Sequence, residues 1–145
     1  MSRQIVLAAD VAADAGAAFE TVTTEHGLTS FWTSDVTASP EIGSLLRFGF
    51  EPAPVDLELT LQATEPGASV VWHAGDNWPD WAGTRMTWSF GAAPDGAMTR
   101  VVFVHDGWAD DYADGELGSV AYTWALVLGA LKGYLETGAA QPALG

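Results

Sequence analysis

The apolar and polar positions at the start of the chain predict one strand followed by a short helix. Residues 3–10, RQIVLAAD, form a short apolar run of the kind found in strands. The next apolar side chains are spaced by three and four, as one buried helix face requires: Ala15, Ala18, Phe19 and Val22. Asp10 or Asp14 is the expected N-cap, because a carboxylate accepts hydrogen bonds from the unpaired N–H groups of a first turn.

A second short helix is predicted directly after the first. The pair His26-Gly27 is expected to end the first helix, and residues 28–32, LTSFW, to form the second. After residues 33–43 the pattern changes to that of strands, because apolar and polar side chains alternate. The apolar members of this alternation form two runs: Leu46, Phe48 and Phe50, then Val55, Leu57, Leu59 and Leu61.

Turn-forming residues then recur at regular intervals and predict an antiparallel meander. The turn sequences are EPG at 65–67, GDNWPD at 75–80 and APDG at 93–96. Three further strands are expected beside them, with the sequences ASVVWHA, TRMTWSF and MTRVVFVHD.

The last third of the chain has the spacing of one long helix. Its start is acidic, which suits the positive end of the helix dipole, and Gly138 is a suitable end. The apolar positions that define the helix are Leu117, Val120, Trp124, Val127, Leu128, Leu131 and Leu135. The predicted fold class is therefore α+β, with this helix lying across a curved antiparallel sheet of six to seven strands.

Length and charge narrow the range of partners. The 145 residues are expected to form one domain, residues 1–145, with a real hydrophobic core. Five basic residues against nineteen acidic ones give a net charge of −14, which repels nucleic acid and anionic membranes. Neither a signal peptide nor a membrane span is recognisable, and there is no cysteine, so a cytoplasmic location is expected.

Motifs for cofactor or metal chemistry are not found in the sequence. His26, His73 and His105 lie in three different predicted elements without the spacing of metal ligands. The acidic residues before the long helix fit helix capping rather than a calcium loop: Asp106, Asp110, Asp111 and Asp114. No phosphate-binding loop or dinucleotide fingerprint is present. We therefore expect no cofactor and no metal, and we assign no catalytic residue.

Several segments together resemble one family. They are AADAGAAFETVTTEHGLTSFWTSDV, which contains the aromatic pair Phe31 and Trp32, then GSLLRFGF, the strand with Trp72, MTRVVFVHDGW and WALVLGALKGYLETG. In this order they resemble the START-like SRPBCC superfamily, in particular its branch of activator of heat-shock-protein ATPase homologues. The resemblance implies a helix-grip fold with a cavity between sheet and helix, over nearly the whole chain. It implies no shared catalytic set, because this scaffold carries many functions.

Candidate ligand-binding residues are aromatic or lie in phase with the core. The turn tryptophans Trp78 and Trp81 are expected to fold back over the end of the sheet, either as a plug or as the wall of a pocket mouth. His105 should point inward, as a hydrogen-bonded core histidine, a ligand anchor or a general base. The other candidates could line a cavity or pack the core: Trp72, Met86, Trp88, Phe90, Phe103, Trp108 and Tyr122. Tyr112 is a weaker candidate, and Arg47 fits a surface ion pair better than a cavity.

Three functions remain open on the sequence alone. The first is the binding of a small apolar, aromatic or lipid-like molecule in the cavity, which is the interpretation we favour. The second is interaction with a chaperone, although the chain starts directly at the first strand without the preceding domain that the eukaryotic activators have. The third is an enzyme of cyclase or hydrolase type that uses His105 in the same cavity.

Overall fold

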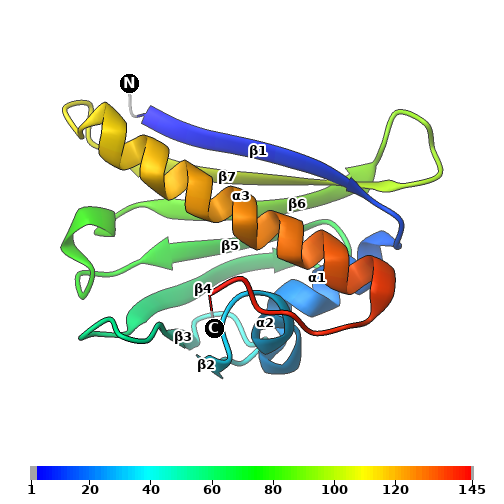
Figure 1. Ribbon diagram of the computed structural model, residues 1–145, viewed down its shortest axis with the longest axis horizontal. Helices are drawn as coiled ribbons and strands as arrows, with labels where there is room; N and C mark the ends of the chain where they lie inside the picture. The colour runs from blue at the N-terminus through cyan, green and yellow to red at the C-terminus, as the bar shows by residue number, and fades with distance from the viewer. Residues whose placement is uncertain (1–2, 145) are drawn as a thin grey trace.

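Residues 3–144 are described by the structure, a computed structural model in which a seven-stranded sheet curves around a long helix (Figure 1). The strands are β1 (Arg3–Val11), β2 (Asp35–Thr37), β3 (Leu45–Gly49), β4 (Leu57–Glu65), β5 (Ser69–Ala74), β6 (Arg85–Ala92) and β7 (Thr99–Trp108). The helices are α1 (Ala15–Thr23), α2 (Glu25–Phe31), a short 3-10 turn η1 (Pro79–Trp81) and α3 (Asp114–Thr137).

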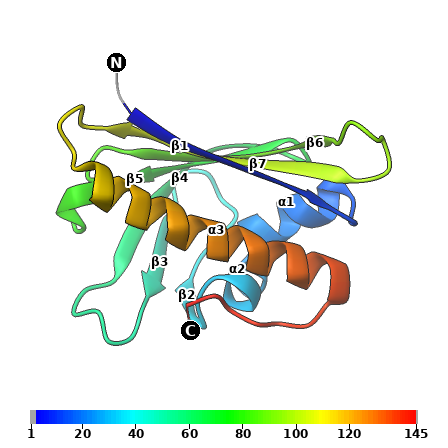
Figure 2. The same cartoon turned by 45° about the horizontal axis from the view of Figure 1, so that its top comes forward.

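The sheet is antiparallel throughout and follows the order β1-β7-β6-β5-β4-β3-β2. The pairing of β1 with β7 joins strands that are distant in sequence and adds the first strand to the edge of the meander. Helix α3 crosses one face of the sheet, and α1 and α2 lie at the end of the sheet where β1 finishes (Figures 1 and 2). This is the helix-grip arrangement that the family resemblance implies, and the predicted fold class is confirmed.

Side chains along the strands alternate between buried and exposed, and the buried ones form the core as predicted. On β6 the side chains of Met86, Trp88 and Phe90 are buried while those between them are partly exposed. The same alternation holds on β4, β5 and β7, so that one face of the sheet is apolar. Helix α3 covers this face with five buried side chains: Leu117, Trp124, Val127, Leu128 and Leu131.

The start of α1 and the junction of α1 with α2 differ in part from the prediction. Asp14 is the N-cap and accepts a 2.7 Å hydrogen bond from the Ala17 N–H, whereas Asp10 stays in β1 and pairs with Arg100 of β7. Thr24 ends α1 and caps α2 through its side chain, so His26 and Gly27 lie inside α2 rather than breaking a helix. The expected break at His26-Gly27 was therefore wrong by two residues, because a threonine hydroxyl supplies the cap.

The strand prediction missed or misplaced a few residues in the region before β4. Strand β2 is only three residues long and was not predicted, since so short an edge strand has little pattern. Phe50 lies just after β3, and Val55 precedes β4 with an exposed side chain. Arg47 forms the predicted ion pairs, with Asp35 at 2.7 Å and Asp56 at 3.0 Å.

The C-terminal segment returns to α2 after the long helix. Gly138 takes φ 75°, the left-handed conformation that ends many helices, as predicted. The N–H groups of Gln141, Ala143 and Leu144 then donate to the carbonyls of Ser30, Phe31 and Trp32, respectively. These bonds satisfy carbonyl groups at the end of α2 that have no partner within the helix. They also place Leu144 beside Trp32, next to the site described below.

Within residues 3–144, no helix is both long and apolar enough to cross a lipid bilayer.

We predict that Gly27→Ala destabilises the protein by about 2 to 3 kcal/mol, because an added Cβ would lie 2.0 Å from the carbonyl oxygen of Thr21. Backbone atoms cannot move aside as a flexible side chain can. Gly129→Ala on the exposed side of α3 is the matched control, since its Cβ meets nothing within 4 Å. For Gly129→Ala we expect the free energy of unfolding to rise by up to about 1 kcal/mol, because alanine has the higher helix propensity. Urea denaturation measures both, and equal stability of the two variants would contradict the close packing of α1 on α2.

Candidate functional site

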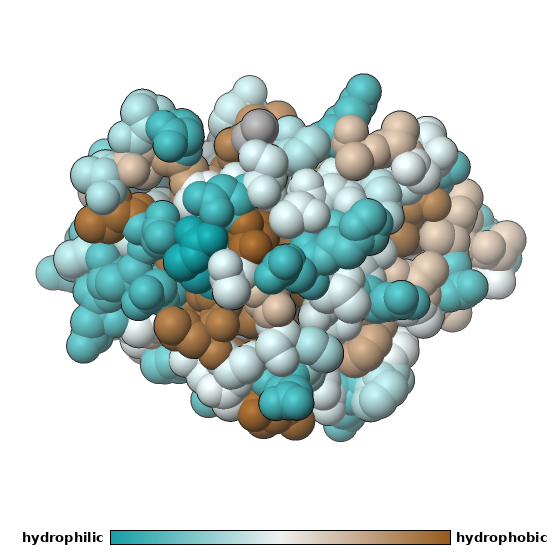
Figure 3. Space-filling model, turned by 90° about the horizontal axis from the view of Figure 1, so that it is seen from below, coloured by the Kyte–Doolittle hydropathy of each residue, from teal (hydrophilic) through white to brown (hydrophobic). Residues whose placement is uncertain are grey.

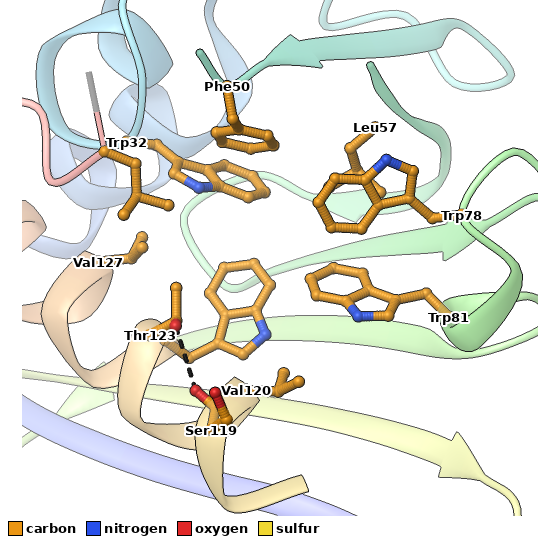
Figure 4. Close-up of a pocket in the computed structure, with 11 residues that line it drawn as sticks. Trp32, Phe50, Leu57, Trp78, Trp81, Ser119, Val120, Thr123 and Val127 are labelled. Carbon is orange, nitrogen blue, oxygen red and sulfur yellow. Dashed lines mark hydrogen bonds between the residues drawn. The ribbon is translucent and has the colours of Figure 1, made fainter. Parts of the chain in front are cut away.

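A cavity of about 290 Å³ lies between the first half of α3, the start of β4 and the turn that joins β5 to β6 (Figure 4). All of its lining residues are uncharged, and only two, Ser119 and Thr123 of α3, carry hydroxyl groups. The lining consists of Trp32, Phe50, Leu57, Trp78, Trp81, Ser119, Val120, Thr123, Trp124, Val127 and Leu144. The cavity is therefore apolar with a small polar strip on the helix side.

Five aromatic rings surround this cavity in a closed sequence of contacts, which we call the aromatic cage. Its members are Phe50, Trp78, Trp81, Trp124 and Trp32. Successive ring centroids lie 5.9, 5.4, 5.8 and 5.0 Å apart in that order, and Trp32 returns to Phe50 at 5.8 Å. Neighbouring rings are inclined by between 33° and 77°, so they form a curved wall rather than a stack.

Four separate segments bring these rings together. Trp32 is the C-cap of α2 and Phe50 follows β3, while Trp124 lies on the buried face of α3. Trp78 and Trp81 come from the turn at residues 75–84, in which η1 directs both rings back toward the sheet (Figure 4). The turn is fixed to β4 by Asn77, which donates to the Asp56 carbonyl and accepts from the Glu58 N–H. The turn tryptophans thus fold back as predicted.

His105 connects two walls of the cage from behind. Its Nδ1 accepts a 3.1 Å hydrogen bond from the Trp124 indole N–H, which can only donate. The Nε2 must then carry the proton and donates to the Thr84 hydroxyl at 2.9 Å, and this hydroxyl donates to the Trp81 carbonyl at 2.6 Å. Burial lowers the pKa of His105 to about 3, so the ring is neutral. His105 is thus a hydrogen-bonded core histidine that links Trp124 to the segment of Trp81.

Most of the predicted ligand residues lie in the core behind the cavity rather than in its wall. Of the candidates, Trp78 and Trp81 line the cavity. Those buried in the core outside the lining are Trp72, Met86, Trp88, Phe90, Phe103, His105 and Trp108. Some of them still support the wall, since Trp72 stacks on Trp32 at 5.7 Å and Phe103 lies 4.2 Å from Trp124.

The two tyrosine candidates lie away from the lining. Tyr122 is 68% exposed, because its position on α3 faces solvent, so the expectation that it faces the cavity is corrected. Tyr112 precedes α3 and stacks on Trp108 with a centroid distance of 4.9 Å. Neither tyrosine belongs to the cavity lining.

Sequence reasoning did not assign the remaining cavity residues to the site. Trp32 and Trp124 were recognised only as a family feature and as a helix face, and Phe50 and Leu57 only as strand positions. The hydroxyl positions Ser119 and Thr123 carried one available signal, because they lie four residues apart on the same side of α3 as Trp124. Leu144 had none, since only the tertiary hydrogen bonds of the C-terminal segment bring it there.

Two indole N–H groups are buried without a hydrogen-bond partner among residues 3–144, those of Trp78 and Trp88. Trp88 lies deep in the core, edge to face with Trp72 at 5.7 Å. Trp78 belongs to the cage, where its ring contacts those of Phe50 and Trp81. A buried donor without a partner costs about 1 to 3 kcal/mol.

Metal-binding clusters are not found in the described part of the chain: residues 3–144 contain no group of three or more His, Asp or Glu side chains placed to hold a metal ion.

The fold and the cavity define a helix-grip protein of the START-like SRPBCC superfamily. Residues 12–136 match the family described as Activator of Hsp90 ATPase homolog 1-like protein, and the chain belongs to that family. The branch inferred from the sequence segments is thereby confirmed. No curated protein matches the chain.

Solved structures agree with this assignment. The solution structure of the Aha1 dimer from Colwellia psychrerythraea is similar with a TM-score of 0.83 and 26% identity, covering 94% of this chain and 98% of that one. Protein SSP2350 from Staphylococcus saprophyticus is similar with a TM-score of 0.75 and 20% identity, covering 96% of each chain. DynU16, a putative protein in the dynemicin biosynthetic locus, is similar with a TM-score of 0.75 and 18% identity, covering 98% of this chain and 49% of that one. The last two show a shared fold.

We predict that stability falls as the pH is lowered from 7 to 5, by about 2 kcal/mol from His105 alone. The pKa of His105 is about 3 in the folded protein and 6.5 ordinarily. Between these values the unfolded chain binds a proton that the folded chain does not, so this contribution is complete above pH 6.5 and is lost as the pH falls. The lowered pKa values of Asp10, Asp35 and Glu136 act only below about pH 4.5.

The measurement is the free energy of unfolding in urea at several pH values, for the parent and for His105→Gln. The variant should lose about 2 kcal/mol of the pH dependence between pH 7 and 5 while being less stable at pH 7. An unchanged slope in His105→Gln would contradict the assignment of this titration to His105.

Proposed function

We propose that this protein binds a small, mostly apolar or aromatic molecule in the cavity enclosed by the aromatic cage. The observation that carries the proposal is the convergence of five aromatic rings from four segments on one open space. Protein interiors are otherwise close-packed, with few voids larger than a water molecule. Side chains of this size could fill the space by a small rearrangement, so their arrangement around it favours a site over a packing defect.

The composition of the wall supports the same function. Small-molecule sites are lined mainly by apolar and aromatic side chains, with a few polar groups that set orientation. Here the hydroxyls of Ser119 and Thr123 form that polar strip, and the Thr123 hydroxyl donates to the Ser119 carbonyl (Figure 4). The volume of about 290 Å³ is near the lower end of roughly 300–1,000 Å³ for such pockets. It suits one or two fused rings, or the end of a longer molecule.

Interaction with a chaperone is the second candidate, favoured by the family match and by the similarity to the Aha1 structure from Colwellia psychrerythraea. The direct test is the ATPase rate of a purified chaperone of the Hsp90 class with and without this protein. A rise in rate that saturates with added protein would support the second candidate, and an unchanged rate would remove it.

An enzyme based on His105 gains no support from the site. Both ring nitrogens of His105 already bond to Trp124 and Thr84, and the ring is outside the cavity lining. A general base needs a free acceptor within hydrogen-bond reach of the substrate. We therefore propose binding rather than acid–base catalysis as the function of this cavity.

We predict that Trp78→Ala weakens the binding of a small aromatic probe such as naphthalene at least about tenfold, because one ring of the cage is lost. Tyr122→Ala is the matched control, since it removes an exposed aromatic side chain from α3 outside the lining. The dissociation constants come from titration well below the melting temperature. Equal affinity of the parent and Trp78→Ala would refute the cavity as the binding site, and a loss in Tyr122→Ala alone would move the site to the helix surface.

A further inference from the structure

The charges around the aromatic cage favour one class of ligand. Every lysine and arginine of the chain is already paired with a carboxylate: Arg3 with Asp114, Arg47 with Asp35 and Asp56, Arg85 with Asp106, Arg100 with Asp10, and Lys132 with Glu136. The chain carries a net charge of −14, and the cavity lining contains no charged side chain. An anionic ligand would therefore enter a negative field without a basic partner.

Two carboxylates lie at the Trp81 side of the cage. Asp80 lies in η1 directly before Trp81, and Glu116 lies in the first turn of α3, one turn before Ser119 and Val120 of the lining. Both act on Tyr112: burial raises the pKa of its hydroxyl, and the charges of Asp80 and Glu116 raise it further. Tyr112 stacks on Trp108, whose centroid is 6.1 Å from that of Trp81. This end of the cage is therefore negative.

The geometry of the cage suits a positive charge as well as an apolar group. Five centroids spaced by 5.0 to 5.9 Å on a closed path lie on average no more than about 5 Å from their common centre, within the roughly 6 Å at which an aromatic ring attracts a cation. Tryptophan, which supplies four of the five rings, is the strongest aromatic partner for cations. A weakly hydrated organic cation can enter such a site at little cost, whereas a small metal ion would lose its water shell.

We infer that the aromatic cage binds a small organic ammonium ion, quaternary or protonated, whose positive group lies among the four tryptophans and Phe50 while its apolar body contacts Leu57, Val120 and Val127. This inference rests on the proposed function and names the chemistry of the ligand. The free cation is the source that the charges favour, because a choline lipid headgroup would bring a phosphate into the same negative field. Steering by the field raises the association rate of such a cation.

The test compares two molecules of the same shape, benzyltrimethylammonium and its uncharged carbon analogue neopentylbenzene, by calorimetric titration at low salt. We expect the cation to bind at least about fivefold more tightly, and this advantage to shrink at high salt as the field is screened. Equal or tighter binding of neopentylbenzene would overturn the inference while leaving the proposed function in place. If neither molecule binds, the proposed function fails with it.

Two double variants distinguish the effect of the carboxylates near the cage from the effect of the overall net charge. Asp80→Asn with Glu116→Gln should lower the ratio of cation to analogue affinity at least about twofold. Glu65→Gln with Asp95→Asn removes the same charge at the turns β4–β5 and β6–β7, at the opposite end of the sheet from residues 75–84 (Figure 1). In this control variant, the ratio of cation to analogue affinity should equal that of the parent. Equal effects of the two variants, or none in the first, would contradict the role of the carboxylates at the cage.

The source of the cation is tested with phosphatidylcholine vesicles, which present the trimethylammonium group beside a phosphate. We expect vesicles not to displace bound benzyltrimethylammonium. Displacement at equal headgroup concentration would contradict a free small cation as the ligand and would assign the site to a lipid headgroup.

Discussion

The packing of Trp124 between sheet and cavity is the interaction on which this structure most depends. Its ring lies 4.2 Å from that of Phe103 on the sheet side and 5.0 Å from that of Trp32 on the cavity side, and its N–H donates to His105. One side chain thus fixes α3 on the sheet, sets the tautomer of a buried histidine and forms part of the cage. The indole N–H of Trp124 can only donate a hydrogen bond. Every bond in the chain from Trp124 through His105 and Thr84 to the Trp81 carbonyl is therefore donated toward Trp81.

This dependence explains why the cavity lies where it does. Toward the C-terminal end of α3, Tyr134 and Leu135 lie beside residues of α1 and α2, while Leu128 and Leu131 are buried in the core. Around the first half of α3, the turn at 75–84, Trp32 and Leu144 line the cavity instead, and the rings of the turn meet their neighbours at steep angles. On the face seen from below, hydrophobic side chains form separate patches among hydrophilic ones (Figure 3).

Periodicity sufficed for the fold, because each strand of the meander has one buried face and α3 has one apolar stripe. The same signal could not identify the site. Trp88 and Trp124 are both buried and both in phase, yet only Trp124 reaches the cavity, since the difference depends on how α3 crosses the sheet. Trp78 and Trp81 could be found because tryptophans in a turn have no strand to bury them. Phe50 and Leu144 could not be found, because tertiary contacts alone bring them to the cavity.

The proposed function requires the cage to be a binding site rather than a loosely packed part of the core. A crystal structure of the protein grown with a saturating small aromatic probe tests this most directly. We predict that the probe lies inside the cage, in contact with Trp32, Trp78 and Trp124, with His105 still bonded to Trp124. A probe bound only on the outer surface, or rings that move together to fill the space and exclude it, would contradict the proposal.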